Sequence, residues 1–337
     1  MTRPCRGLSR LLTRRDVIRC GLAAAFGVGV SGARAQPLPD TARILVGFPP
    51  GGAPDFIARR LADQLAGKLA RAVVVDNRPG AGGRIAVDVA RQAPADGATL
   101  LLNPSGVLTI NPHSYRKLNY EPFKDFTPIS LAALIDYGFG VGPAVPAEVR
   151  NIADFAAWAR ANVGKVTCGS PAAGAPPHFV GDALSRALGL SMTHVPYRGG
   201  APALNDLMGG QISALVLSLG DMLQHARAGK LRLLASSGAA RSRFAPELAT
   251  FAEQRVAGLE LRDWFAVYIA GAPAPEVAER VGAAVRGALG HPAYAQALAA
   301  NSLDAGVSSP AELDRLGRGD LERWRPIVQA SGFVADS

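Results

Sequence analysis

Cysteine is rare in this chain, and long apolar segments are missing from most of it. Only three of the 337 residues are cysteine. No segment after residue 35 approaches the roughly 18 to 20 uninterrupted apolar residues that a membrane-spanning helix needs. We therefore expect no membrane-spanning helix in that part of the chain.

The patterns of metal and catalytic sites are also missing. There is no Gly-x-Ser-x-Gly elbow, so the usual nucleophile of an exported hydrolase is not in evidence. Cys168 ends an apolar segment, which is typical of a buried free thiol, and catalysis by Cys168 with a histidine is the less favoured interpretation. The histidines show no ligand spacing, and we expect no metal, no cofactor and no catalytic residue; they are His113, His178, His194, His225 and His291.

Residues 1–35 are typical of an export signal. They combine several arginines with an apolar run at 21–30 and the small-x-small end Ala33-Arg34-Ala35. Cleavage after Ala35 would start the mature chain at Gln36 in the periplasm. Residues 13–19 resemble the twin-arginine export motif, but Val17 stands where that motif prefers Phe, so the twin-arginine and general routes both stay open.

The formal charge of +9 comes largely from that signal. Residues 1–35 carry seven arginines and one acid, so 29 basic and 26 acidic residues remain after cleavage. This balance gives no electrostatic basis for nucleic-acid binding. Cleavage also leaves Cys168 alone, which excludes an internal disulfide. The remaining 302 residues suffice for two medium-sized domains.

Apolar periodicity predicts alternating strands and helices. The first unit has strands at 43–48, 72–76 and 99–102 and helices at 55–69 and 84–91, a βαβαβ order that implies a parallel sheet. The pattern returns with helices at 152–162, 177–188, 201–208 and 221–228 and strands at 165–168, 192–195, 214–217 and 231–236. Pro275, Pro292 and Pro310 are placed as first-turn residues of three final helices.

The loop after the first strand is the most informative segment. It contains Pro49-Pro50-Gly51-Gly52 and leads into a helix. Glycines let a ligand approach the main chain, and a helix N-terminus presents free N–H groups, so the loop could bind a carboxylate. A plain tight turn explains the same residues equally well.

Several motifs together resemble one family. In order and spacing the chain is similar to the Bug or TctC type of extracytoplasmic solute-binding protein, the periplasmic receptor of tripartite tricarboxylate transporters, from about residue 43 to 332. The motifs are Phe48-Pro49-Pro50-Gly51-Gly52 with Asp55, Asn77-Arg78-Pro79-Gly80, Asp96-Gly97, Asn111-Pro112, Lys124-Asp125-Phe126, Pro176-Pro177-His178, His194-Val195-Pro196-Tyr197 and Ala228-Gly229-Lys230-Leu231.

The resemblance implies a two-domain type II periplasmic-binding-protein fold, with the ligand cleft between two doubly wound α/β lobes. Domain 1 would comprise residues 36–141 and 261–337, and domain 2 residues 142–260. The implied function is capture of a small carboxylic acid and delivery to membrane transporter subunits or a sensor kinase, by a monomer without enzymatic activity. The alternative is an exported α/β hydrolase or transferase acting on a carboxylated substrate.

Each domain would offer one loop to the ligand, at 49–55 and 169–178. Asp55 is expected at the N-cap or first turn of its helix, with an indirect role in ordering the loop. Ser105 follows the third strand at its carboxyl end, where open α/β sheets bind ligands. Trp264 and Phe265 are expected as hinge or core aromatics. The expected ligand-binding residues are Phe48, Pro49, Gly51, Gly52, Asp55, Asn103, Ser105, Ser170, Ala173, Gly174, Ala175 and Leu217.

Two positions depart from the pattern that the resemblance implies. Many members have a hydroxyl residue where this chain has Ala175, and many have Asp-Asn where it has Leu217-Ser218. A polar ligand group left without a partner there would cost about 1 to 3 kcal/mol. We therefore expect a more apolar pocket, suited to a small acid with an apolar or aromatic body rather than to a tricarboxylate or a free amino acid.

Overall fold

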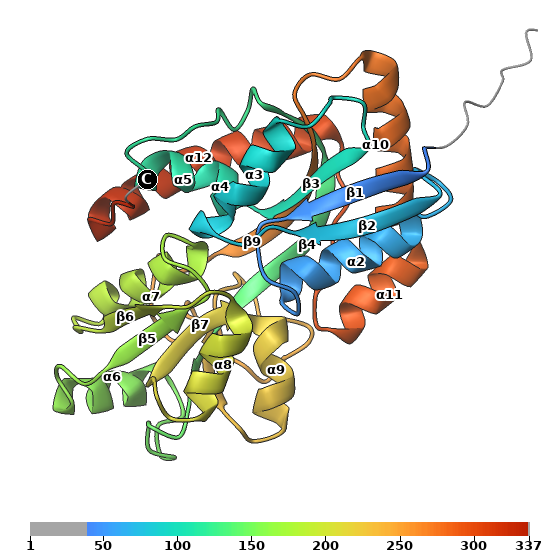
Figure 1. The fold of residues 1–337 in the computed structure, drawn as a ribbon. Helices are drawn as coiled ribbons and strands as arrows, with labels where there is room; N and C mark the ends of the chain where they lie inside the picture. Colours follow the sequence, from blue (N-terminus) through green and yellow to red (C-terminus); the bar gives the residue numbers. More distant parts are fainter. Residues whose placement is uncertain (1–38, 336–337) are drawn as a thin grey trace, which may run out of the picture. The chain divides into compact units, whose positions relative to one another are not determined.

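The computed structural model describes residues 39–335, and these residues form two α/β lobes that share the long strand β4 (Phe126–Val141) (Figure 1). The expected export signal and its cleavage after Ala35 lie outside the described residues. Between residues 39 and 335 no helix has both the length and the apolar character needed to cross a membrane.

Lobe 1 contains the first sheet. Strand β1 (Thr41–Val46) pairs in parallel with β2 (Ala72–Asn77) and β3 (Thr99–Pro104). Strand β9 (Arg262–Ala270) then pairs antiparallel with β3 and with the first part of β4. The two-residue strand β10 pairs with β4 as well. The helices of this lobe are α2 (Ala53–Leu65), η1 (Ala81–Gly83), α3 (Arg84–Arg91), α4 (Gly106–Thr109), α5 (Asn111–Ser114), α10 (Pro275–Leu289), α11 (Pro292–Ala300) and α12 (Pro310–Ser331).

Lobe 2 continues from the end of β4. Strand β7 (Ala214–Ser218) pairs antiparallel with β4, and β5 (Thr167–Ser170) lies in parallel between β7 and β6 (Thr193–Pro196). Strand β8 (Arg232–Ser236) also pairs with β4. The helices of this lobe are α6 (Ile152–Ala161), α7 (Pro176–Ala187), α8 (Gly200–Met208) and α9 (Leu219–Arg227).

Strand β4 changes partner between two adjacent residues. Asp136 is paired with Arg262 of β9, whereas Tyr137 is paired with Ser218 of β7. The two-lobe α/β fold is thus confirmed. The predicted division into 36–141 plus 261–337 and 142–260 stays a prediction, and the change of partner favours a first boundary a few residues before 141.

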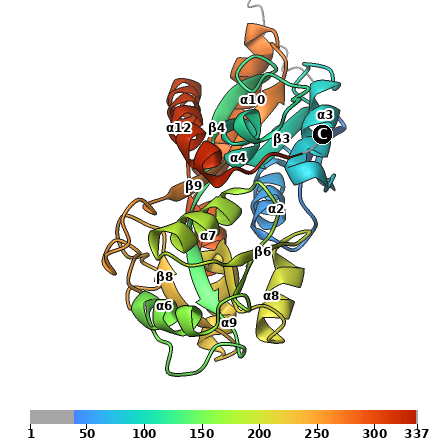
Figure 2. The same cartoon turned by 90° about the vertical axis from the view of Figure 1, so that its left-hand side faces the viewer.

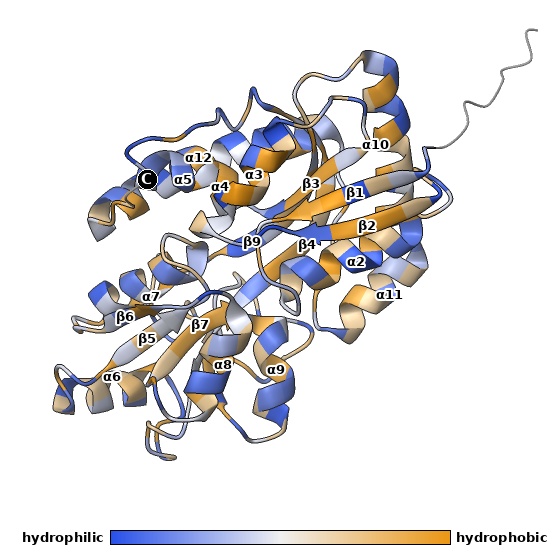
Figure 3. Ribbon diagram, in the orientation of Figure 1, coloured by the Kyte–Doolittle hydropathy of each residue, from blue (hydrophilic) through white to orange (hydrophobic). Residues whose placement is uncertain are grey.

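The predicted periodicity is visible in the helices. In α2 the side chains of Ile57, Leu61 and Leu65 recur on one face and are fully buried. This helix ends at Leu65 instead of the predicted residue 69, because Ala66 is extended and Gly67 takes a positive φ of 74°. Figure 3 shows apolar residues concentrated in the strands and on one side of several helices.

The last helix, α12, belongs to lobe 1 and packs against lobe 2. Ser309 and Glu312 form a capping box at the start of α12. Near its other end, the ring of Trp324 lies 6.1 Å from Phe179 of α7, and Phe333 lies 5.0 Å from His178 of the same helix. Figure 2 shows α12 above α7 at this junction. Helix α12 and the residues after it therefore contact α7 of lobe 2, on the side of the molecule opposite β1 and β2 (Figure 1).

Candidate functional site

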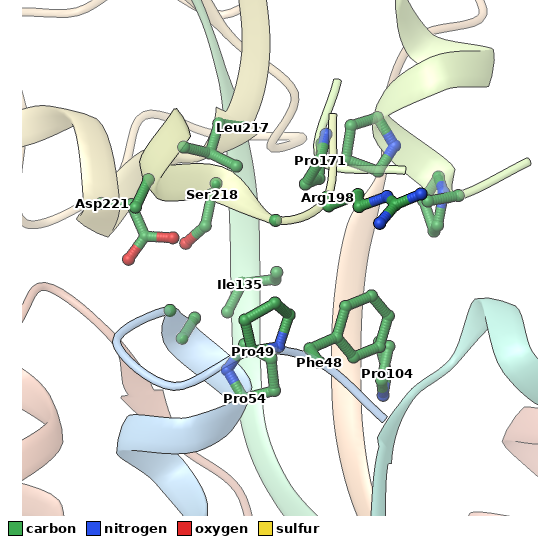
Figure 4. A pocket seen from close by; sticks show the side chains of 18 of the residues that line it. Phe48, Pro49, Pro54, Pro104, Ile135, Pro171, Arg198, Leu217, Ser218 and Asp221 are labelled. Carbon is green, nitrogen blue, oxygen red and sulfur yellow. The ribbon is translucent and has the colours of Figure 1, made fainter. Parts of the chain in front are cut away.

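A cavity of about 100 Å³ lies between the two lobes. The loop after β1 forms one wall, and the loops after β5 and β6 form the other together with the end of β7 and the first turn of α9 (Figure 4). Most of the lining is apolar. Its apolar side chains include Phe48, Pro49, Pro104, Ile135, Pro171, Leu217 and Phe265, and its polar ones are Tyr137, Arg198, Ser218 and Asp221.

Asp55 shapes the wall that lobe 1 contributes. Its Oδ2 accepts hydrogen bonds from the Gly51 amide at 3.0 Å and from Arg59 Nε at 2.9 Å. Burial raises the pKa of Asp55, but these donors outweigh burial and hold the pKa below its usual value. The N-cap of α2 is Gly52, so Asp55 is the first-turn acid. It fixes the loop and is absent from the cavity lining.

Three helix N-termini point at the cavity, those of α2, α8 and α9, whose N-cap residues are Gly52, Gly199 and Ser218. In α2 the Ala53 amide donates to Asp221 and Pro54 has no N–H, so the free amides are mainly those of α8 and α9. The first N–H groups of a helix have no partner within it and carry the positive end of its dipole. These termini therefore add positive potential to a mainly apolar cavity, and Asp221 counteracts it next to α2 and α9.

Helix α7 differs, because its expected amide donors are unavailable. Pro176 and Pro177 occupy its first two positions and have no N–H. The His178 amide donates to Ala175 O at 3.0 Å, and the Gly174 amide donates to His178 Nδ1 at 3.2 Å. The loop at 169–178 therefore contributes apolar surface at Pro171, Ala175 and the two prolines.

Four polar side chains reach the cavity. Tyr137 donates its hydroxyl to the buried carboxylate of Asp263. Ser218 Oγ is buried and has no hydrogen-bond partner within residues 39–335. Arg198 is exposed and makes no ion pair in that same part of the chain. Ser218 and Arg198 are thus available to a ligand.

Asp221 is the fourth polar side chain of the lining. Removal from water raises its pKa to about 6, and a hydrogen bond from the Ala53 amide opposes that rise. Asp221 lies in the first turn of α9, while Ala53 begins α2 in the other lobe. An acid of the protein itself therefore faces the α2 N-terminus, where the sequence predicts the ligand's carboxylate.

Five of the twelve sequence-predicted site residues line this cavity. They are Phe48, Pro49, Gly52, Ala175 and Leu217. Gly51 lies at an adjoining hollow next to Asp221, and Ala173 lies at another next to Arg198. Ligand contact by each of these seven residues stays a prediction. The five that line the cavity are better placed for it than Gly51 and Ala173.

The other five predicted residues are absent from the lining. Asp55 is engaged in the loop, as described above. Ser105 donates to Asp263 beneath the cavity, and Asn103 is fully buried in β3. Ser170 Oγ donates to Ala172 O at 2.9 Å and contacts His194 Nε2 at 2.8 Å. Gly174 has a φ of 73° and packs against Phe333.

Sequence reasoning missed the two charged residues of the lining. Arg198 comes two residues after β6, and Asp221 comes three residues after β7. Both therefore follow the carboxyl end of a parallel strand, where open α/β sheets bind ligands, and applying that rule to every strand would have found them. Of the two aromatics expected at the hinge or core, Phe265 reaches the cavity and Trp264 donates to Asp320 at 2.7 Å.

Comparison with known proteins identifies the relatives of this chain. Residues 57–333 match the tripartite tricarboxylate transporter family receptor, TctC. A Pseudomonas protein described as the UPF0065 protein in the tcbD-tcbE intergenic region is 32% identical over 287 residues, which are 84% of this chain and 84% of the relative.

Two solved structures are similar over nearly their whole length. The periplasmic binding protein BugD is 26% identical, with a TM-score of 0.82 over 88% of this chain and 99% of BugD. An R. palustris protein solved with adipate, Rpa4515, is 29% identical, with a TM-score of 0.83 over 88% of this chain and 99% of that one. The two lobes, the cavity between them and these matches agree: this chain belongs to the TctC family, the solute-binding receptors of tripartite tricarboxylate transporters.

Proposed function

We propose that the solute of this receptor is a small carboxylic acid with an apolar body, held in the cavity between the lobes and delivered to membrane transporter subunits. A sensor kinase is the second partner to which such a receptor could present its solute. The observation that carries this proposal is the combination of an apolar lining with Arg198 and the free amides of α8 and α9.

The apolar lining supports a ligand with an apolar body. Each Å² of apolar surface removed from water contributes about 25 cal/mol, so burial of roughly 60 Å² contributes about 1.5 kcal/mol. Leu217 and Ala175, at which the family resemblance implies an acid and a hydroxyl in many members, both line the cavity. A ligand with several carboxylates would leave some of them without partners, and we expect citrate to bind poorly.

The cationic end supports a carboxylate. Arg198 has a planar guanidinium that matches the geometry of a carboxylate, and the N-terminus of α8 starts two residues later. Charge-assisted hydrogen bonds of this kind are stronger than neutral ones. The adipate in the R. palustris relative supports capture of a small carboxylic acid, and its second carboxylate is the group that we do not expect this site to match.

The site lacks the arrangement that catalysis needs, which supports binding without chemistry. Burial raises the pKa of the Cys168 thiol to about 12, so the thiolate needed for nucleophilic attack is disfavoured. Neither Cys168 nor the stacked pair His178 and His194, whose ring centres are 3.7 Å apart, lines the cavity. We propose that the chain is not an enzyme, and that the exported hydrolase or transferase is the weaker alternative.

The place of action follows from the family, whose receptors are periplasmic. We propose that residues 1–35 direct export, by the twin-arginine or the general route, and are cleaved after Ala35. The mature protein would act as a monomer without a cofactor.

A thermal-shift panel, followed by calorimetry, tests the ligand class. The panel contains citrate, aspartate, glutamate, nicotinate, benzoate and short branched acids. We expect an apolar monocarboxylate to stabilise the protein most, and Ala175→Thr or Leu217→Asp to weaken that stabilisation. Stronger stabilisation by citrate or aspartate than by every monocarboxylate would overturn the proposal.

A further inference from the structure

The cavity has opposite charges at its two ends. Figure 4 shows Arg198 on one side and Asp221 on the other, with Leu217, Pro49 and Ile135 between them. Strand order supports the separation, because β6 and β7, which precede the two residues, lie on either side of β5. Adjacent strands lie about 4.8 Å apart, so the two strand ends are about 10 Å apart.

The acidic end lacks a cationic partner within the described residues. The hydrogen bond from Ala53 and removal from water are the influences that act on the Asp221 carboxylate. Ser218, three residues before it, contributes a buried hydroxyl without a partner in residues 39–335. A carboxylate beside such a hydroxyl, at the edge of an apolar cavity, is suited to accept hydrogen bonds from a cation or another donor.

We infer that the preferred solute carries its carboxylate at the Arg198 end and a hydrogen-bond donor, ammonium or hydroxyl, at the Asp221 end, with apolar carbon between them. This inference rests on the proposed function and narrows it to an ω-amino or ω-hydroxy acid. Asp221 is then the specificity residue, because it repels a second carboxylate and pairs with a donor.

The separation of the charges also excludes α-amino acids. In aspartate the ammonium is attached next to a carboxylate, so a molecule bound to Arg198 would keep both charged groups at that end. Its second carboxylate would then extend toward Asp221, which carries the same sign. Aspartate and diacids are both unfavourable for the same physical reason.

Matched ligand triplets test the inference by calorimetry at pH 7.5. The triplets keep the chain length and change one end: 3-aminopropanoate, butanoate and succinate; 4-aminobutanoate, pentanoate and glutarate; 5-aminopentanoate, hexanoate and adipate. At the best length we expect the amino acid to bind at least fivefold more tightly than the methyl-ended acid. We expect the diacid to bind at least tenfold more weakly than the amino acid.

Asp221→Asn should bring all three ligands of the best triplet to within about threefold of one another. Glu148→Gln is the matched control, because it removes one negative charge from an exposed residue outside the cavity, and it should preserve the preference. Melting curves of both variants establish that they are folded.

The outcomes separate the two proposals. If methyl-ended acids or diacids bind as tightly as the amino acids, the inference is overturned while carboxylate capture stands. The same holds if the preference persists in Asp221→Asn. If no carboxylate of any triplet binds, and none of the earlier panel does, the proposed function fails and the inference fails with it.

Discussion

Tyr137 donates its phenolic hydroxyl to the carboxylate of Asp263 where β4 passes from one lobe to the other. Both groups are buried, and the same carboxylate also accepts from Ser105 Oγ and from the Trp264 amide. Burial raises the pKa of Asp263 although all three donors favour its charged form. The buried Asp263 carboxylate of β9 thus fixes Tyr137 of β4, which lines the cavity, and Ser105, which follows β3.

Tyr137→Phe should destabilise the protein. It removes one donor from a buried carboxylate, a loss of about 1.5 to 3 kcal/mol in the free energy of unfolding. Urea denaturation at pH 7.5 measures the change. Tyr294→Phe is the control, because Tyr294 donates to the carbonyl of Ala132 at 2.9 Å and should lose only about 1 kcal/mol. Equal losses in the two variants would contradict the special role of Asp263.

Asp221→Asn should stabilise the unliganded protein at pH 7.5. Folding raises the pKa of Asp221 from 3.8 to about 6, so the ionised side chain opposes folding above that range. As the pH falls from 6 toward 3.8 the wild-type side chain becomes neutral in the folded protein, and the difference between wild type and variant disappears. Melting temperatures between pH 4 and 8 measure this; a gain that is constant with pH would contradict the cause.

Gly52→Asp should weaken ligand binding with little effect on the melting temperature without ligand. A Cβ at Gly52 would contact only Pro54 Cδ, at 3.7 Å, and the φ of −95° suits any residue. For a methyl-ended acid bound at Arg198, the new negative charge would lie about 10 Å away at the Asp221 end of the cavity, where like charges repel by about 1.7 kcal/mol at an effective dielectric constant of about 20. We expect affinity to fall at least tenfold, about 1.4 kcal/mol by calorimetry. Gly52→Ala separates crowding from charge and should lose less; equal affinity in Gly52→Asp would mean that the loop is only a turn.

Ligand binding should draw the two lobes together about the crossings at β4 and the start of β9. Neither lobe encloses the cavity alone, and hinge closure is the usual response of two-lobed binding proteins. Small-angle scattering with a saturating ligand should show a smaller radius of gyration than the same sample without ligand. An unchanged radius at saturation would argue for a cavity that is already closed.

A variant at a residue outside the cavity lining also tests closure of the lobes. Gly106 begins α4 in lobe 1, and a Cβ there would lie 2.9 Å from Pro176 Cδ in lobe 2. Gly106→Ala should therefore oppose close approach of the lobes and weaken binding, with a smaller decrease of the radius on adding ligand. Gly319→Ala is the control, because a Cβ at Gly319 would have no neighbour within 4 Å.

Most helices and strands, and their order, could be predicted from the sequence alone. Periodicity and helix signals placed α3 at 84–91, and the prolines at 275, 292 and 310 begin the last three helices. These features depend on neighbours along the chain, so they can be read without knowing the fold. Boundaries such as that of β5, which starts at Thr167 instead of residue 165, were less certain because pairing with β6 and β7 sets them.

Which side chains reach the cavity could not be predicted from local sequence and is known from the tertiary structure. The sequence predicts that the loop at 169–178 donates amides, but the amides of Gly174, Ala175 and His178 are bonded locally, and prolines occupy the first two positions of α7. Ser170 turns toward His194, while Arg198 reaches the cavity from the loop after β6 and Asp221 from the first turn of α9, and no local motif distinguishes either position. Periodicity reports which face of an element is buried, whereas the direction of such a side chain depends on partners elsewhere in the chain, such as His194 for Ser170 and Ala53 for Asp221.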